Sequence, residues 1–142
     1  MSIDNLRVNK LRTYLFNIIQ SLNESYKQIN VNFLSDEVDN YSLDKIPTET
    51  EVSSWIIGDV LHRDVYSFRG RMNYSADTIE NIENIGFYEI FEKIIRTNNE
   101  NGILPDINGI ESIRCLNSGT MNNANTNTAE FDIQIQIEYR EV

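Results

Sequence analysis

The segment from residue 129 to residue 139 alternates strictly between apolar and polar side chains, and this pattern limits the fold more than any other. Its sequence is AEFDIQIQIEY, in which every odd position is apolar and every even position is polar. A repeat of two residues places successive side chains on opposite faces of a β-strand. The segment is about twice as long as the usual strand of roughly five to six residues. The pattern therefore predicts one long strand with a buried face and a polar face.

The N-terminal segment has the spacing of a helix. Apolar residues recur there at intervals of three and four, which places them on one helical face over about five turns. These residues are Ile3, Leu6, Leu11, Tyr14, Leu15, Ile18, Ile19 and Leu22. Asn23 and Ser25 are expected to end the helix.

The middle of the chain favours strands. The alternating residues Ile29, Val31 and Phe33 predict a short strand. Residues 35–50 are polar and acidic, and we expect a loop there. Residues 51–75 predict two strands joined by a tight turn around Gly58. In the second of these strands one face carries Val60, His62, Asp64, Tyr66, Phe68 and Met72, and the other carries Leu61, Arg63, Val65, Ser67, Arg69 and Arg71.

A second helix is expected after Ser75, a suitable N-terminal cap. Its predicted apolar stripe consists of Ile79, Ile82, Gly86, Ile90 and Ile94, with Phe87 and Phe91 beside it. A glycine within a helix, here Gly86, indicates either a close approach to the sheet or a bend. Residues 112–116 alternate as a further strand, and residues 118–128 are expected to form a polar loop before the final strand.

Together these elements predict an α+β fold in one domain covering residues 1–142. The expected order is α-β-β-β-α-β-β, with an antiparallel sheet of about five strands and both helices packed on one face. A chain of 142 residues is long enough for one hydrophobic core.

Composition excludes several classes of function. The formal net charge of −10 argues against broad contact with nucleic acid phosphates, because such contact needs clustered cations. Arg63, Arg69 and Arg71 form only a small basic cluster. No apolar run is long enough to cross a bilayer, and the N-terminus lacks the apolar block of a signal peptide, so we expect no membrane association. With Cys115 as the single cysteine, an intramolecular disulfide is excluded.

Residues able to carry out catalysis are few. His62 is the single histidine, and its place within a strand favours a packed or surface side chain over a general base. Cys115 is expected to be a small buried hydrophobe. The acidic stretch SDEVDNYSLD lacks the ligand spacing, the central glycine and the final glutamate of an EF-hand loop. The glycines are scattered and form no phosphate-binding loop. We therefore expect neither an enzyme nor a bound metal or cofactor.

The last two thirds of the chain, from near Ile46, resemble a known family. The pieces that carry the resemblance are a glycine turn before a strand ending YSFRGRMNYS, a helix containing NIGFYEIFEKI, a GILPDI connector, and a Thr/Asn-rich loop before the alternating final strand. In this order they resemble the small tail-terminator, or tail-completion, proteins of tailed bacteriophages of Firmicutes, often labelled minor capsid proteins. Residues 1–44 agree with the family only in the order of their elements.

The resemblance implies a structural protein of the virion. Members of such a family form rings, commonly hexameric, that cap the tail tube, stop its elongation and provide the attachment surface for the head or neck. The implied partners are other copies of the chain, the tail tube protein, and the sheath and neck or connector proteins. The implied location is the head-proximal end of the virion tail, assembled in the cytoplasm of the host bacterium. The alternatives are a head–tail connector or neck protein, and a small cytoplasmic α+β binding domain.

Four parts of the chain are candidates for the interfaces of such a ring. They are the second strand of the hairpin, the acidic loop and the Asn-rich loop, together with the polar face of the final strand. The candidate residues are Asp36, Glu37, Asp39, Arg63, Arg69, Arg71, Asn122, Asn123, Asn125, Gln134 and Gln136.

Overall fold

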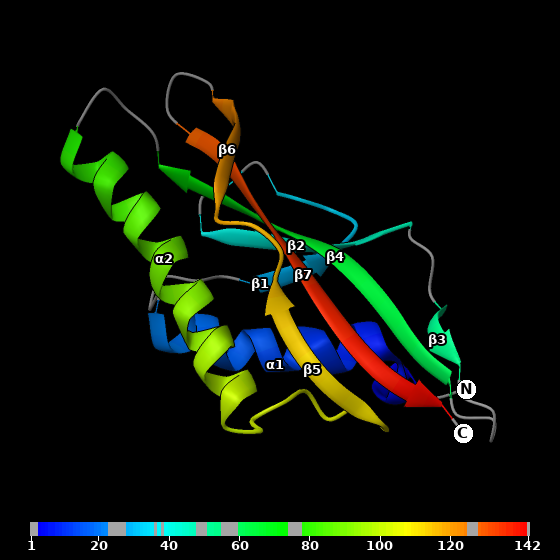
Figure 1. Ribbon diagram of the computed structural model, residues 1–142. Helices are drawn as coiled ribbons and strands as arrows, with labels where there is room; N and C mark the ends of the chain where they lie inside the picture. Colours follow the sequence, from blue (N-terminus) through cyan, green and yellow to red (C-terminus); the bar gives the residue numbers. More distant parts are fainter. Residues whose placement is uncertain are drawn as a thin grey trace.

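The computed structural model describes residues 3–22, 28–35, 37, 39–47, 51–54, 60–73, 78–124 and 128–141. As predicted, these residues form an α+β fold with two α-helices and one sheet (Figure 1). In chain order the elements are a 3₁₀ turn at Ile3–Asn5, α1 at Arg7–Leu22, β1 at Gln28–Val31, β2 at Asn40–Ile46, β3 at Glu51–Ser54, β4 at Val60–Asn73, α2 at Thr78–Glu100, β5 at Ile110–Cys115, β6 at Thr120–Ala124 and β7 at Thr128–Glu141.

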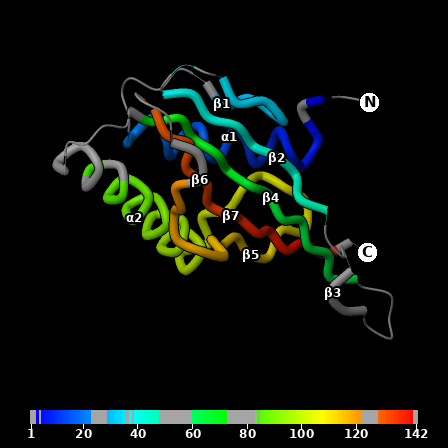
Figure 2. The backbone as a smooth tube through the Cα atoms, turned by 90° about the horizontal axis from the view of Figure 1, so that it is seen from above, coloured from blue at the N-terminus to red at the C-terminus, as the bar shows by residue number. Residues whose placement is uncertain are grey.

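The sheet is mixed. Its strands follow the order β1-β2-β4-β7-β5, with β3 also paired to β4 and β6 also paired to β7 (Figure 2). β1 runs parallel to β2, whereas every other described pair is antiparallel. The prediction of about five antiparallel strands is therefore wrong in both number and direction, since the described residues form seven strands.

The two longest strands form the centre of the sheet. β4 and β7 have 14 residues each, and their ladder is continuous from Val60 opposite Glu141 to Asn73 opposite Thr128. Figure 1 shows them running side by side along the whole sheet. The alternation in β7 has the predicted effect, because Phe131, Ile133 and Ile137 are all buried on one face. The long final strand is confirmed.

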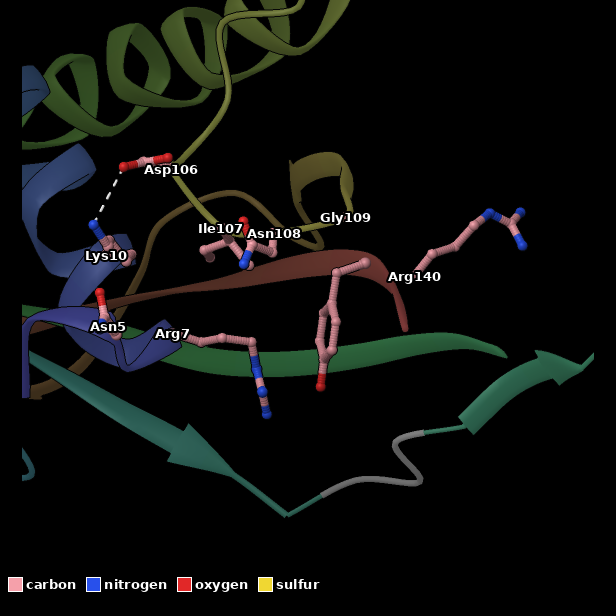
Figure 3. A pocket seen from close by; sticks show the side chains of 9 residues that line it. Asn5, Arg7, Lys10, Asp106, Ile107, Asn108, Gly109 and Arg140 are labelled. Atoms are coloured by element: carbon pink, nitrogen blue, oxygen red, sulfur yellow. Dashed lines mark hydrogen bonds and ion pairs between the residues drawn. The ribbon is translucent and has the colours of Figure 1, made fainter. Parts of the chain in front are cut away.

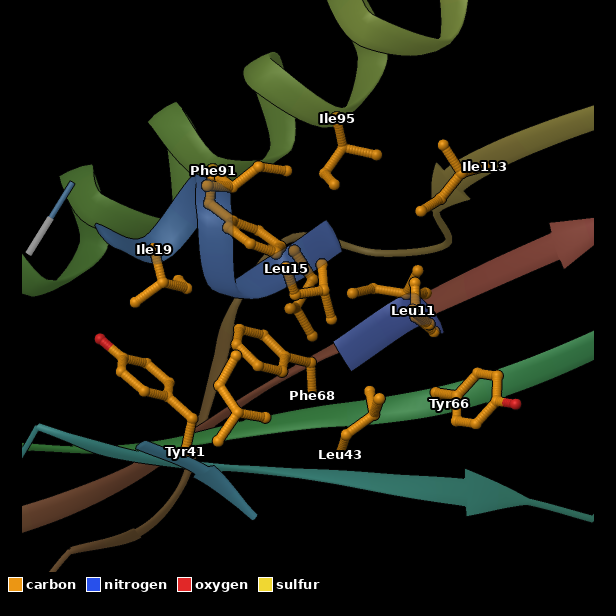
Figure 4. Packing of buried hydrophobic residues seen from close by; sticks show 14 of the residues in the cluster. Leu11, Leu15, Ile19, Tyr41, Leu43, Tyr66, Phe68, Phe91, Ile95 and Ile113 are labelled. Atoms are coloured by element: carbon orange, nitrogen blue, oxygen red, sulfur yellow. The ribbon is translucent and has the colours of Figure 1, made fainter. Parts of the chain in front are cut away.

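Both helices cover the same face of the sheet, as predicted (Figure 4). Leu11, Leu15 and Ile19 of α1 are fully buried, and they point toward the same layer of sheet side chains as Phe91 and Ile95 of α2. The sheet contributes a cluster in which stacked rings are prominent, including Phe68 stacked on both Tyr41 and Phe91. α1 begins at Arg7, so the residues before it form the 3₁₀ turn and not the first turn of the helix.

The buried stripe of α2 differs from the predicted one. Tyr88, Phe91 and Ile95 face the core, whereas Ile90 is 51% exposed. The larger area of the aromatic rings explains the difference, because burying a ring removes more apolar surface from water than burying an isoleucine does. The helix is thus rotated toward its aromatic residues.

The expected close approach at Gly86 is also wrong. A Cβ atom placed on Gly86 would meet no atom within 4 Å. The close approach occurs instead at Gly70 in β4, where a Cβ atom would lie 2.7 Å from the hydroxyl oxygen of Tyr88 and 2.9 Å from the ring of Tyr41. Gly70 therefore lets two tyrosine side chains pack against the backbone of the central strand.

Residues 40–46 form β2, where the sequence predicted a loop. β2 lies between β1 and β4, and its Tyr41 and Leu43 are fully buried under the helices. Its intervening residues are polar, which concealed the alternation. In β1 only the first apolar residue of the expected strand is buried; Val31 is largely exposed and Phe33, beyond the end of β1, is 62% exposed.

Part of the expected loop before β7 is the strand β6. Thr120 to Ala124 pair with the first residues of β7, on the same edge that β5 pairs with farther along. Between β5 and β6 the side-chain oxygen of Asn117 accepts a hydrogen bond from the backbone N–H of Gln134, with an N–O distance of 2.9 Å. The antiparallel pairing of β5 with β7 is confirmed. The turn predicted around Gly58 and the cap predicted at Ser75 lie outside the described residues.

Candidate interface on the open face of the sheet

The face of β4 and β7 that points away from the helices consists mainly of polar and charged side chains. We call it the open face. The register places the odd-numbered residues of β4 and the even-numbered residues of β7 and β2 on it. Its members from β4 and β7 are Leu61, Arg63, Val65, Ser67, Arg69, Arg71, Asn73, Thr128, Glu130, Asp132, Gln134, Gln136, Glu138 and Arg140.

Arg69 lies between two carboxylates on the open face. Its Nε atom is 2.5 Å from Oδ2 of Asp44 on β2, and its Nη1 atom is 2.9 Å from Oε1 of Glu130 on β7. Burial, the largest single influence, lowers the pKa of Arg69, but the hydrogen bonds and charges of Glu130 and Asp44 outweigh it and raise this pKa above its ordinary value. The three side chains tie β2, β4 and β7 together across the sheet.

Further hydrogen bonds continue this network along the strands. The hydroxyl of Ser42 donates to Oδ1 of Asp44 at 2.6 Å, and the hydroxyl of Ser67 donates to Oδ1 of Asp132. Gln136 donates through Nε2 to Oε1 of Glu138 at 3.1 Å. Ser42 and Gln136 are buried although no described helix lies over them. The open face is therefore an ordered polar layer, because each of these groups is held by a neighbour.

The acidic loop lies at one end of the open face, beside Arg71. Nε of Arg71 donates to the backbone oxygen of Ser35 at 3.1 Å, and the backbone N–H of Asp39 donates to the backbone oxygen of Arg71 at 2.9 Å. Asp39 has a positive φ of 61°, a conformation that aspartate tolerates better than most residues. Glu37 is exposed, and Asp36 lies outside the described residues.

The Asn-rich segment lies at the same end of the sheet. Four neighbouring strands are in register here. Glu130 of β7 is opposite both Asn123 of β6 and Arg71 of β4, and Arg71 is in turn opposite Asn40, the first residue of β2. Asn122 is also part of β6. The structure does not describe the side chains of Asn122 and Asn123, and Asn125 lies outside the described residues. One end of the sheet thus brings together the acidic loop, Arg71 and the strand that carries the asparagines.

The remaining predicted residues lie farther along the open face. Gln134 is half-buried in the middle of β7, and Gln136 is buried beside it. Arg63 is opposite Glu138 near the other end, and its buried Nε atom has no hydrogen-bond partner among the described residues. Arg63 is therefore separated along β4 from Arg69 and Arg71, and the three arginines do not form a single basic cluster.

Sequence reasoning missed a group centred on Asp64, on the opposite, helix-covered face. The carboxylate of Asp64 is 0% exposed, with Nε of Arg7 at 2.8 Å and Nζ of Lys45 at 3.6 Å. The hydroxyls of Tyr66 and Tyr139 donate to it at 3.4 and 3.5 Å. A signal was present in the sequence: Asp64 occupies a core-facing position in β4, and a buried carboxylate needs partners of opposite charge.

These contacts change the acidities around Asp64. Burial and the negative charge of Asp64 raise the pKa of Tyr66 far above its ordinary value. Burial lowers the pKa of Arg7, but the hydrogen bond and charge of Asp64 outweigh it and raise this pKa. The Arg7 guanidinium also lies over the ring of Tyr139, 4.4 Å from its centre. The contacts around Asp64 therefore connect the start of α1 to β2, β4 and β7.

The two residues considered for catalysis are packed within the fold. The ring of His62 stacks on Tyr139 with 5.3 Å between ring centres. Cys115 is half-buried, and burial, assisted by the charge of Glu92, raises the pKa of its thiol to about 12. Within the described ranges, no group of three or more His, Cys, Asp or Glu side chains is placed to hold a metal ion. Among the described helices none is both long and apolar enough to span a membrane.

Comparison with known proteins adds no further assignment. No protein-family model matches the chain, and no curated protein matches its sequence.

Proposed function

We propose that this chain is a structural tail terminator, which forms a ring on the last layer of tail-tube subunits, stops tube growth and provides the surface for the head or neck. The proposal starts from the resemblance described above. The observation that carries it furthest is the open face: an ordered polar layer on two 14-residue strands, with no described helix over it. Such a preformed surface suits contact with other subunits, because little side-chain freedom is lost on binding.

The edges of the sheet support the same proposal. Within the described residues β1 pairs only with β2, and β5 and β6 pair only with β7. Each of these three strands therefore has one edge that pairs with no described strand. Subunits of a ring meet head to tail through two different surfaces, and two separate sheet edges meet that geometric need. The net charge of −10 would also repel DNA that passes through the ring.

The role proposed is assembly and not catalysis. Its partners would be further copies of the chain, the tail tube protein, and the sheath and neck or connector proteins. Ring size, commonly six in the family that the sequence resembles, belongs to the proposal as well.

Deletion of the gene tests the role in assembly. We expect tails of uncontrolled length, or tails that do not join heads, in electron micrographs of the lysate. Tails of normal length without heads would favour the alternative of a neck or connector protein. Normal particles would refute any role in the tail.

A charge substitution tests the part played by the open face. Gln134→Lys adds a positive charge to the middle of that face without removing a described hydrogen bond of its side chain. Thr97→Lys adds the same charge at an exposed position on α2. Light scattering of each purified variant, mixed with tube subunits, should show fewer rings for Gln134→Lys and unchanged rings for Thr97→Lys. Equal assembly by the two variants would contradict a contact through the open face.

A further inference from the structure

A surface cleft lies between the start of α1, the connector that precedes β5, and the end of β7 (Figure 3). Its volume is about 930 Å³. Cationic and amide side chains line much of it, namely Asn5, Arg7, Lys10 and Asn108. Arg140 borders the cleft at the end of β7, but its side chain points away from these residues, to the open face, and pairs with Glu111. The cleft thus lies apart from the open-face residues described above.

Arg7 is held in one orientation at this cleft. Its Nε atom is fixed by the buried carboxylate of Asp64 at 2.8 Å, and its planar group lies over the ring of Tyr139. Within the described ranges, no acceptor is paired with its two terminal amino groups. A guanidinium that is fixed through Nε and still has terminal N–H groups can donate to an oxyanion, and it loses little freedom when it does so.

A second cation of the cleft has an easily replaced partner. Nζ of Lys10 lies 3.2 Å from Oδ2 of Asp106, and the side chain of Asp106 is 92% exposed. An ion pair this exposed contributes only about 0–1 kcal/mol. A carboxylate that enters the cleft can therefore take the place of Asp106 at Lys10 at little cost.

The balance of charge around the cleft favours an anion. The cations at the cleft and around their partners are Arg7, Lys10 and Lys45 and the acids are Asp64 and Asp106, so cations outnumber acids among these described side chains. The chain as a whole has a net charge of −10. A polyphosphate such as DNA would be repelled by the rest of the surface. A short acidic peptide places only a few carboxylates into the cleft, and the amides of Asn5 and Asn108 can bond to its backbone.

We propose that this cleft is a binding site for an acidic segment of a partner protein, whose carboxylates are recognised by Arg7 and Lys10. The proposal does not depend on the tail-terminator function, because it follows from the cleft alone. Arg7 supplies the fixed donor, and Lys10 exchanges Asp106 for a carboxylate of the ligand.

Fluorescence anisotropy with fluorescein-labelled hexaglutamate tests the site at physiological ionic strength. We expect saturable binding by the full chain, and affinity lower by about tenfold in Lys10→Gln and in Arg7→Lys, which keeps a cation beside Asp64 but loses the planar donor group. Lys93→Gln is the matched control, because it removes the same charge at an exposed position on α2 outside the cleft. Asp106→Asn frees Lys10 and should raise the affinity by about two- to fivefold, a gain that misfolding cannot produce.

Several results would overturn the proposal. Absence of saturable binding is one, and equal loss of affinity in Lys93→Gln and the cleft variants is another, since it would mean a general charge effect. If labelled hexalysine bound more tightly than labelled hexaglutamate, the negative net charge of the whole chain, and not the cations of the cleft, would determine which peptide binds. Unlabelled hexaglutamate, inorganic phosphate and a short DNA duplex can each be tested as competitors of the labelled peptide. If phosphate or DNA displaces it at a lower concentration than unlabelled hexaglutamate does, the ligand of the cleft is a phosphate group and not a carboxylate.

Discussion

Replacing Asp64 with asparagine should destabilise the fold far more than a typical loss of an ion pair. Asparagine keeps the shape of the side chain and an acceptor oxygen for Tyr66 and Tyr139, but removes the charge that faces Arg7 and Lys45. The perturbation therefore tests the charge and leaves the packing of the buried site unchanged.

The size of the effect follows from the exposure of the two cations. Removing one partner of a fully buried ion pair costs about 3–5 kcal/mol, because the other charge remains buried and unpaired. Asp64 is fully buried, but the side chains of Arg7 and Lys45 are 36% and 47% exposed, so water can solvate part of each. We therefore expect the free energy of unfolding to fall by about 2–3 kcal/mol, below the range for a fully buried pair.

Urea unfolding followed by circular dichroism measures this loss, and Asp106→Asn provides the control. Both substitutions remove the carboxylate that faces a cation of α1, but Asp106 is 92% exposed and its pair with Lys10 should contribute less than about 1 kcal/mol. With a slope of about 1–3 kcal/mol per molar urea, the Asp64→Asn midpoint should fall by roughly 1–2 M.

Similar midpoints for the two variants would refute the reasoning. They would mean that Asp64 does not hold α1 to the sheet through its charge. A lower slope for Asp64→Asn alone would instead indicate a change in compactness, and the comparison of midpoints would then lose its meaning.

Three other substitutions and one chemical reaction test the packing. In urea unfolding, Gly70→Ala should lower the free energy of unfolding by about 1–3 kcal/mol, because the new methyl group meets Tyr88 and Tyr41. Gly86→Ala should raise it by about 1 kcal/mol, because alanine favours the helix and its methyl group meets no atom there. Tyr88→Phe should leave stability unchanged or raise it by up to about 1 kcal/mol in the same assay, because the buried hydroxyl has no partner among the described residues. A substantial loss would reveal a bond to that hydroxyl. Cys115 should react slowly with iodoacetamide at mildly alkaline pH in the native chain and rapidly in urea, because burial raises its thiol pKa to about 12; equal rates would contradict that burial.

Local periodicity was sufficient to predict the elements that carry a continuous apolar face. α1 has Leu11, Leu15 and Ile18 at helical spacing, and β7 has five consecutive odd positions buried from Phe131 to Tyr139. In both elements the side chains alone decide which face is buried, so the sequence was informative. The α+β class and the placement of both helices on one face followed from these patterns.

The elements that were missed depend on distant partners. β2 has only Tyr41 and Leu43 as buried apolar residues, and its Asp44 is held by Arg69, 25 positions away in the chain. β6 consists mostly of polar residues, and it is a strand because β7 extends beyond the end of β5 and can form hydrogen bonds with it. Neither interaction leaves a local pattern in the sequence, and nor does the parallel pairing of β1.

The same difference explains how far the candidate interface could be predicted. The polar alternation of β4 and β7 identified the residues of the open face, but it could not show that Arg69 is already paired with Asp44 and Glu130. An arginine held by two carboxylates has little remaining charge to offer a partner, so Arg69 is better suited to ordering the surface than to binding through it. Arg63 is only half-buried, and no described carboxylate is paired with it as Asp44 and Glu130 are paired with Arg69, so its charge is available to a neighbour. If the open face contacts another subunit, Arg63→Gln should therefore weaken that contact while leaving the fold intact, and Arg69→Gln should first lower stability.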